Sequence, residues 1–129
     1  MKRLCWSGMA VLLVVLVAGI AVAADKDMIQ SQVDEIVAAI DGGAPADSFG
    51  DAAKKEPYYI FIMEEPGKMV VHPTLTGESL KEKAGPVYEE LVKATPDGTW
   101  VDYEWQGQMK HTYVRNTQNG LIVGSGYSD

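Results

Sequence analysis

Apolar and polar positions divide the chain into a long apolar segment followed by an amphipathic pattern. The apolar segment covers residues 10–24 and follows the basic residues Lys2 and Arg3. Small residues at Ala21 and Ala23 match the site that signal peptidase cleaves, so we expect residues 1–24 to be a signal peptide. The alternative is an uncleaved inner-membrane anchor, because the stretch counted from residue 4 to residue 24 has 21 residues and could span a bilayer.

The pattern changes to a helical period directly after this segment. It predicts a helix over Asp25–Ile40, which Asp25 or Asp27 can cap. One face of this helix carries the apolar residues Ile29, Val33, Ile36, Val37 and Ile40. The small and polar residues 44–55 predict a loop with one helical turn.

Residues 58–72 have the pattern of a β-hairpin. A β-prone run over Tyr58–Met63 is followed by the turn Glu64–Gly67 and by a second strand over Lys68–His72. Residues 73–83 are expected to be irregular. Pro86 suits the first position of a helix that runs to about residue 94.

The last third of the chain predicts three antiparallel strands, over residues 99–105, 108–116 and 121–127. In the first strand Val101, Tyr103 and Trp105 share one face and Trp100 lies on the other. The expected fold is α+β: a sheet of about five antiparallel strands with the long helix and a short helix packed on one side.

Composition and charge exclude several kinds of function. The chain has 11 basic and 18 acidic residues, a net charge of −7, which argues against nucleic-acid binding. Cleavage would remove Lys2, Arg3 and the only cysteine, Cys5, and leave a net charge of −9. The remaining chain of residues 25–129, which we expect to be one domain, could then form no disulfide and no cysteine-based zinc site.

Enzyme and metal motifs are missing from the sequence. The glycines around Ser125 do not have the spacing of a nucleophile elbow. The two histidines, His72 and His111, have no second histidine or cysteine at metal-ligand spacing. We therefore expect no catalytic residue, no metal and no cofactor. A haem ligated by His72 or His111 with Met63 or Met109 is a minor alternative, because no haem attachment motif is present.

One set of residues has the composition of a small-ligand pocket. Lys110 lies in a strand with Thr112, and the aromatic residues Trp100, Tyr103, Trp105 and Tyr113 lie on the same or the neighbouring strand. His72 ends the earlier hairpin. Aromatic walls with one cation, a hydroxyl and an imidazole suit a small anion. Lys110 and Tyr113 have opposite parity, however, so only a bulge could turn both toward one pocket.

These residues and their order resemble the single Cache family of extracellular sensor domains. The resemblance rests on YYIFIMEEPGKMVVHP, GESL, GTWVDYEW, the lysine and tyrosine of MKHTYV, and LIVGSGYSD, and it covers roughly residues 58–129. In the usual family pattern a glycine directly precedes the tryptophan, whereas here Thr99 stands between Gly98 and Trp100.

The resemblance implies a PAS-like fold that binds a short carboxylate or a similar small metabolite. It carries ligand-binding roles over to five residues, which are His72, Trp100, Tyr103, Lys110 and Tyr113. Since no second membrane helix or output domain follows the last strand, we expect a solitary periplasmic or secreted module. Such a module would act through a membrane receptor or sensor kinase, and the N-terminal helix could pair two copies as a homodimer. The alternative is a secreted interaction domain whose aromatic residues are simply core.

Overall fold

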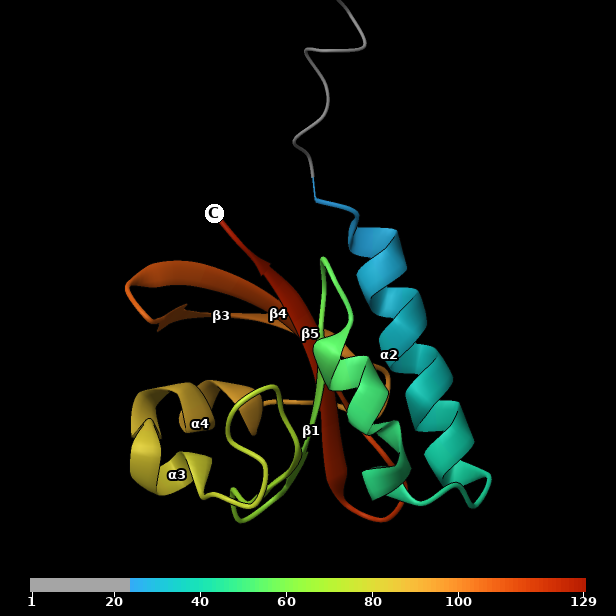
Figure 1. Cartoon of the computed structure of the whole chain (residues 1–129). Helices are drawn as coiled ribbons and strands as arrows, with labels where there is room; N and C mark the ends of the chain where they lie inside the picture. Colours follow the sequence, from blue (N-terminus) through green and yellow to red (C-terminus); the bar gives the residue numbers. More distant parts are fainter. Residues whose placement is uncertain (1–23) are drawn as a thin grey trace, which may run out of the picture.

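The structure, a computed structural model, describes residues 24–129 (Figure 1). The expected signal peptide or anchor therefore lies, except for Ala24, outside the described residues. None of the helices in residues 24–129 is long and apolar enough to cross a membrane. The start of the first described helix and the C-terminal strand end lie at the same end of the molecule (Figure 1).

A five-stranded antiparallel sheet forms the middle of the molecule, with the strand order β2-β1-β5-β4-β3. This arrangement confirms the α+β fold class. The predicted hairpin and the predicted meander meet where β1 pairs with β5, and Phe61 there lies opposite Gly124. The strands are β1 (Ile60–Glu64), β2 (Met69–Val71), β3 (Thr99–Trp105), β4 (Gln108–Asn116) and β5 (Leu121–Ser128).

One face of the sheet is covered by the long helix α2 (Lys26–Asp41) and the 3-10 helix η1 (Ala46–Lys54). The side chain of Asp25 caps α2 by accepting a hydrogen bond from the Met28 N–H at 3.0 Å. The predicted apolar stripe of α2 is buried against this face, which we call the α2 face. η1 consists of two short helical segments with a kink at Phe49, where the sequence predicted a single helical turn.

The opposite face, which we call the α4 face, is covered by two short helices, α3 (Leu80–Lys83) and α4 (Gly85–Leu91). Helices therefore lie on both faces of the sheet, and the expectation that they share one side was wrong. The physical reason is visible in β1, where four successive residues from Ile60 to Met63 are buried. Such a continuous apolar run belongs to a strand that is covered on both sides.

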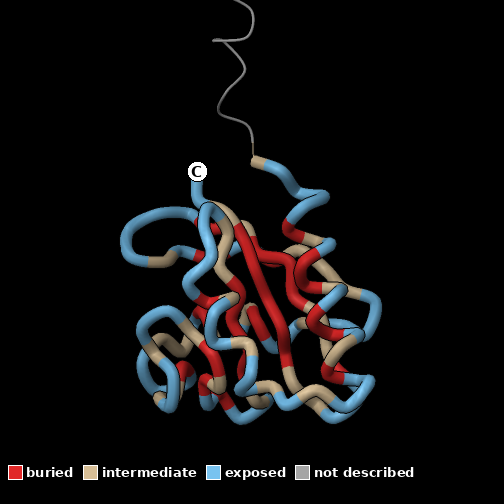
Figure 2. The backbone as a smooth tube through the Cα atoms, turned by 45° about the vertical axis from the view of Figure 1, so that its right-hand side comes forward, coloured by how far each residue is buried: buried red, intermediate tan, exposed pale blue. Residues whose placement is uncertain are grey.

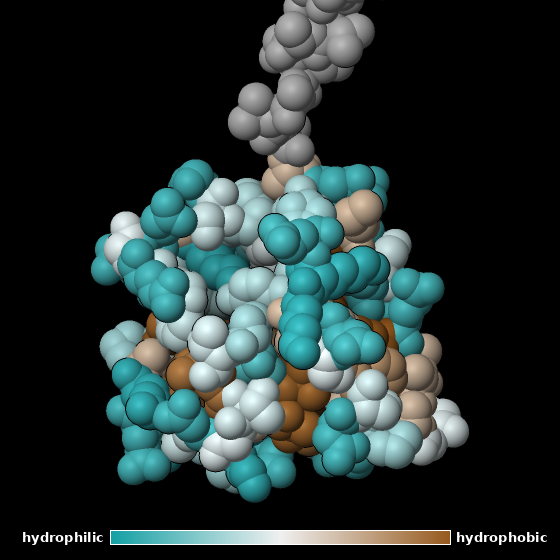
Figure 3. All heavy atoms as spheres, in the orientation of Figure 1, coloured by the Kyte–Doolittle hydropathy of each residue, from teal (hydrophilic) through white to brown (hydrophobic). Residues whose placement is uncertain are grey.

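Burial follows this layered arrangement. Figure 2 shows the buried segments (red) running through the centre of the molecule, with exposed segments (blue) around them. Hydrophilic residues cover most of the side seen in Figure 3, and apolar atoms surface mainly in its lower half.

A β-bulge in β2 decides which face its last residues join. Ile62 pairs with Val71, whereas Met63 pairs with Met69, so Val70 is an extra residue on this strand. Met69 and His72 are three positions apart, and a regular strand would point them to opposite faces. The bulge shifts the alternation by one residue, so both side chains lie on the α4 face.

Candidate functional site

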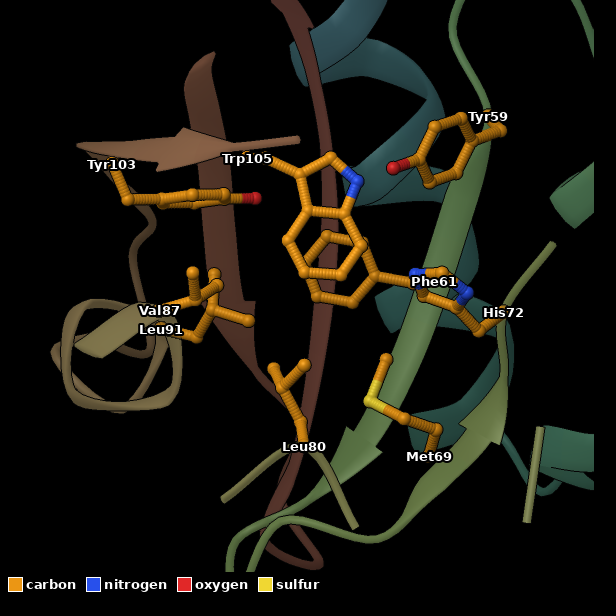
Figure 4. Close-up of a pocket in the computed structure, with 9 residues that line it drawn as sticks. All are labelled: Tyr59, Phe61, Met69, His72, Leu80, Val87, Leu91, Tyr103 and Trp105. Atoms are coloured by element: carbon orange, nitrogen blue, oxygen red, sulfur yellow. The ribbon is translucent and has the colours of Figure 1, made fainter. Parts of the chain in front are cut away.

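A pocket lies between the sheet and the α3–α4 layer (Figure 4). Its wall is aromatic on the sheet side and aliphatic on the helix side. The cavity is small, with a volume of about 10 Å³, which is room for about one water molecule. The lining residues are Tyr59, Phe61, Met69, His72, Leu80, Val87, Leu91, Tyr103 and Trp105.

Lys110 lies beside this pocket as a buried cation. β4 carries it on the α4 face, and its residue surface is only 5% exposed. Its Nζ donates a hydrogen bond to the Tyr59 hydroxyl and lies 4.1 Å from the centroid of the Tyr59 ring. No carboxylate in residues 24–129 forms an ion pair with it. Burial accordingly lowers the pKa of Lys110 to about 8.

His72 is held in one tautomer by the loop that follows β2. Its Nδ1 accepts hydrogen bonds from the backbone N–H groups of Thr74 at 3.0 Å and Leu75 at 3.1 Å. The ring proton must therefore lie on Nε2. Burial, and secondly the charge of Lys110, lower the pKa of His72 to about 4, so the ring is neutral at pH 7.

The ring of His72 belongs to the aromatic cluster of the pocket. It lies edge-on to Tyr59 and Trp105, with centroid distances of 5.9 and 6.1 Å. Figure 4 shows the ring next to Phe61, on the β2 side of the pocket. A neutral imidazole in this position can donate one hydrogen bond from Nε2 toward a bound group.

Tyr103 supplies a second neutral donor on the opposite wall. Its residue surface is 8% exposed, and its hydroxyl accepts a hydrogen bond from Thr112 Oγ1 at 2.9 Å. Burial raises the pKa of Tyr103, so the hydroxyl keeps its proton. Tyr103, His72 and Lys110 together present donors, and the side chains that line the pocket include no carboxylate.

Two of the five predicted ligand-binding residues lie on the other side of the sheet. Trp100 and Tyr113 are paired neighbours on β3 and β4 and pack on the α2 face, with ring centroids 5.6 Å apart. The Tyr113 hydroxyl donates to Asp34 Oδ1 at 3.3 Å and to the Asp97 carbonyl at 3.2 Å. The register of β4 is regular, so strand alternation keeps Tyr113 away from Lys110.

The structure thus brings His72, Tyr103 and Lys110 together and excludes Trp100 and Tyr113 from this pocket. It also adds Tyr59 and Phe61, and it includes Trp105, which the sequence analysis placed in the aromatic set but not among the five predicted ligand-binding residues. Trp105 could have been included among the five, because it shares the strand face of Tyr103. Tyr59 could not, because its approach to Lys110 depends on the pairing of β1 with β5.

The other histidine is engaged elsewhere. His111 is hydrogen-bonded through Nδ1 to Asp102 at 2.6 Å and through Nε2 to Asp129 at 2.8 Å. These two hydrogen bonds raise the pKa of His111. Both ring nitrogens are therefore occupied, which leaves none for the haem iron considered above. The methionine nearest in sequence, Met109, is 44% exposed.

An open groove lies on the outer side of the Tyr59–Lys110 pair. Its volume is about 550 Å³, and both residues of the pair help to line it. The groove is at the end of the molecule where α2 begins and β5 ends. The remaining lining residues are Ala24, Pro57, Tyr58, Gly126, Tyr127, Ser128 and Asp129.

Comparison with known proteins supports the fold. The chain resembles the crystal structure of a methyl-accepting chemotaxis protein from Vibrio parahaemolyticus, with a TM-score of 0.56 and 17% sequence identity over 80% of this chain and 87% of that chain. At this identity the likeness is one of fold. It shows that the α+β, PAS-like arrangement occurs in a chemoreceptor protein.

A second solved structure is a weaker match. The extracellular domain of the putative histidine kinase mmHK1S-Z2 has a TM-score of 0.48 and 18% identity over 66% of this chain and 37% of that chain. No family model matches the chain, and no curated protein matches it. Membership of the single Cache family therefore stays a prediction.

Proposed function

We propose that this chain is a sensor-type domain that binds a small carboxylate in the pocket between the sheet and α4. Lys110 would form the ion pair, and His72 and Tyr103 would each donate one hydrogen bond. The observation that carries this proposal is the buried ammonium of Lys110, which has only a neutral phenol as its polar partner. A carboxylate would supply the missing charge.

The energetics favour an anion in this position. A cation removed from water without a counter-charge is unfavourable, and an ion pair with additional hydrogen bonds compensates for that loss. Charge-assisted hydrogen bonds are roughly twice as strong as neutral ones. Since the donors already stand around an apolar cavity, the ligand would need an anionic head and a short apolar body.

The pocket must enlarge to admit such a ligand, because its volume is about 10 Å³. Trp105 is the side chain that we expect to move. It is only half-buried, and it stands at the end of β3 next to the turn Gln106–Gly107. Movement of this hairpin end would open the pocket without disturbing the buried centre of the sheet.

The fold likeness to a chemotaxis protein supports a sensory role for the binding event. We propose that the domain is exported and that it reports ligand occupancy to a membrane receptor or sensor kinase. Membership of the single Cache family and pairing of two copies through α2 belong to the same proposal.

The test is a thermal-shift measurement of the protein with acetate, propionate, lactate and pyruvate. A ligand at 100 times its dissociation constant should stabilise the fold by about 2.7 kcal/mol, which is a rise of several degrees in Tm for a domain of this size. Lys110→Met should abolish the shift, while the exposed control Lys54→Met should retain it. A shift that persists in Lys110→Met would refute the assigned ion pair.

The small cavity favours one second candidate, a secreted interaction domain in which the aromatic cluster is only core. That candidate predicts no thermal shift with any small carboxylate. It also predicts that the protein is captured by a partner through an exposed surface, with no effect of Lys110→Met on capture.

A further inference from the structure

The unfavourable free energy of a buried lysine charge without a counter-ion can be avoided in two ways. It can bind an anion, as proposed above, or it can lose its proton and become a neutral amine. We propose that Lys110 is a reactive amine that forms an imine with small aldehydes or ketones that enter through the groove. This proposal concerns the same side chain as the proposed function but does not require that a carboxylate binds.

The groups around Lys110 favour the neutral amine. Tyr103 faces it from the paired position on β3, Tyr59 from the residue before β1 and His72 from the residue after β2, and all three are uncharged at pH 7. The acidic residue among those that line the groove is Asp129, whose side-chain carboxylate is bound to His111. No carboxylate in residues 24–129 forms an ion pair with Lys110 that would hold its proton.

The pKa of about 8 agrees with these surroundings. At pH 7 roughly one Lys110 in ten would be neutral, compared with fewer than about one in a thousand for a lysine of ordinary pKa. Desolvation in an apolar pocket is an established way to activate a lysine as a nucleophile. Lys110 combines this activation with access, because it also lines the groove of about 550 Å³.

The reaction balances without a co-reactant. The lone pair of the neutral Nζ adds to the carbonyl carbon, the carbonyl π electrons move to oxygen, and one proton passes from Nζ to that oxygen to give a carbinolamine. Loss of the hydroxyl as water, together with the remaining N–H proton, forms the C=N bond. The Tyr59 hydroxyl, which is hydrogen-bonded to Nζ, is placed to pass a proton to the oxygen.

The test uses the unaltered protein, with propanal as the probe and cyanoborohydride to reduce the imine. Peptide mass spectrometry then follows propyl addition at each lysine at limiting reagent. The exposed residues Lys54, Lys55 and Lys68 are matched controls within the same molecule. At pH 7 we expect Lys110 to be modified at least about tenfold faster than these controls, because of its larger neutral fraction.

The pH dependence provides a second criterion. The ratio of Lys110 to Lys54 labelling at the same pH, in which the pH dependence of the cyanoborohydride step cancels, should be constant up to about pH 8 and should then fall toward pH 10. Labelling of Lys110 no faster than that of Lys54, or a parallel pH profile, would overturn the proposal. Neither result depends on the carboxylate thermal shift, so failure of this inference and failure of the proposed function are distinguishable.

Discussion

The two faces of the sheet hold their polar side chains in different ways. On the α2 face, Gln32 donates to the Tyr58 carbonyl at 2.9 Å and to Ser125 Oγ at 2.8 Å. Arg115 pairs with Asp34 at 2.9 Å on the same face. Gln32 therefore has hydrogen-bond acceptors and Arg115 has a carboxylate of opposite charge. On the α4 face, Lys110 has a phenol in place of a carboxylate.

This difference separates structural polar groups from candidate functional ones. A polar group that is satisfied within the chain stabilises one arrangement of the fold. A buried cation that lacks its counter-charge destabilises the fold. The comparison therefore agrees with the proposal that Lys110 on the α4 face takes part in ligand recognition, whereas Gln32 on the α2 face is satisfied within the chain.

The largest expected difference between the two faces comes from replacing one polar residue on each face by an apolar residue of similar size. Gln32→Leu should lower the free energy of unfolding by about 1–3 kcal/mol, because it leaves Ser125 and the Tyr58 carbonyl without their donor. Lys110→Met should leave it unchanged or raise it by about 1 kcal/mol, because a buried unpaired charge is removed. Urea denaturation at pH 7 measures both.

A loss of stability in Lys110→Met as large as that in Gln32→Leu would contradict the distinction between the faces. It would mean that Lys110 is as much a part of the folded core as Gln32.

Alkaline pH offers a related test on the unaltered protein. The pKa of Lys110 is about 8 in the folded state and about 10.4 in the unfolded chain. Between these values the unfolded chain binds more protons, so the free energy of unfolding should rise with pH. Lys110→Met should lack this rise. An identical pH profile of the variant from pH 8 to 10 would argue against the unpaired amine.

The two histidines should titrate on opposite sides of the ordinary imidazole value. His72 on the α4 face should protonate only near pH 4, and its contribution to stability should be lost as pH falls from about 6.5 toward that value. His111 should stay protonated above its usual pKa, and its contribution should be lost as pH rises through the raised value. Histidine ring resonances followed by NMR measure both pKa values.

Assignment requires one variant for each histidine. His72→Asn should remove the low-pH titration, and His111→Asn should remove the high one. If both rings titrated together near pH 6.5, the burial of His72 and the carboxylate contacts of His111 would both be in doubt.

The smallest expected effects come from two tyrosines on the two faces. Tyr103→Phe removes a donor of the proposed site and should weaken a bound carboxylate by about 1 kcal/mol, or roughly fivefold. Tyr113→Phe removes the contacts to Asp34 and Asp97 and should leave ligand affinity unchanged. Calorimetry with the best carboxylate from the thermal-shift panel compares them. Weaker binding only in Tyr113→Phe would indicate that the ligand binds on the α2 face.

Several parts of this picture could be predicted from local patterns. The alternation of β3 and β4 correctly separated Tyr103 and Trp105 from Trp100, and it showed that Lys110 and Tyr113 have opposite parity. The five predicted ligand-binding residues nevertheless included Trp100 together with Tyr103, and Tyr113 together with Lys110. That prediction followed residue type and family resemblance. Strand parity was the more reliable guide, since the structure has no bulge in β4.

Local sequence patterns suffice to predict the elements: the amphipathic α2, the hairpin, the three-stranded meander and the face on which each side chain of β3 and β4 lies. These features depend on residues close together along the chain, because helical and strand periods act locally. The pairing of β1 with β5, the bulge at Val70 that turns His72 toward α4, and the contact of Tyr59 with Lys110 depend on the folded sheet. The strand pairing joins residues as far apart as Ile60 and Ser125, which are separated by 65 positions, and packing of the whole sheet selects it.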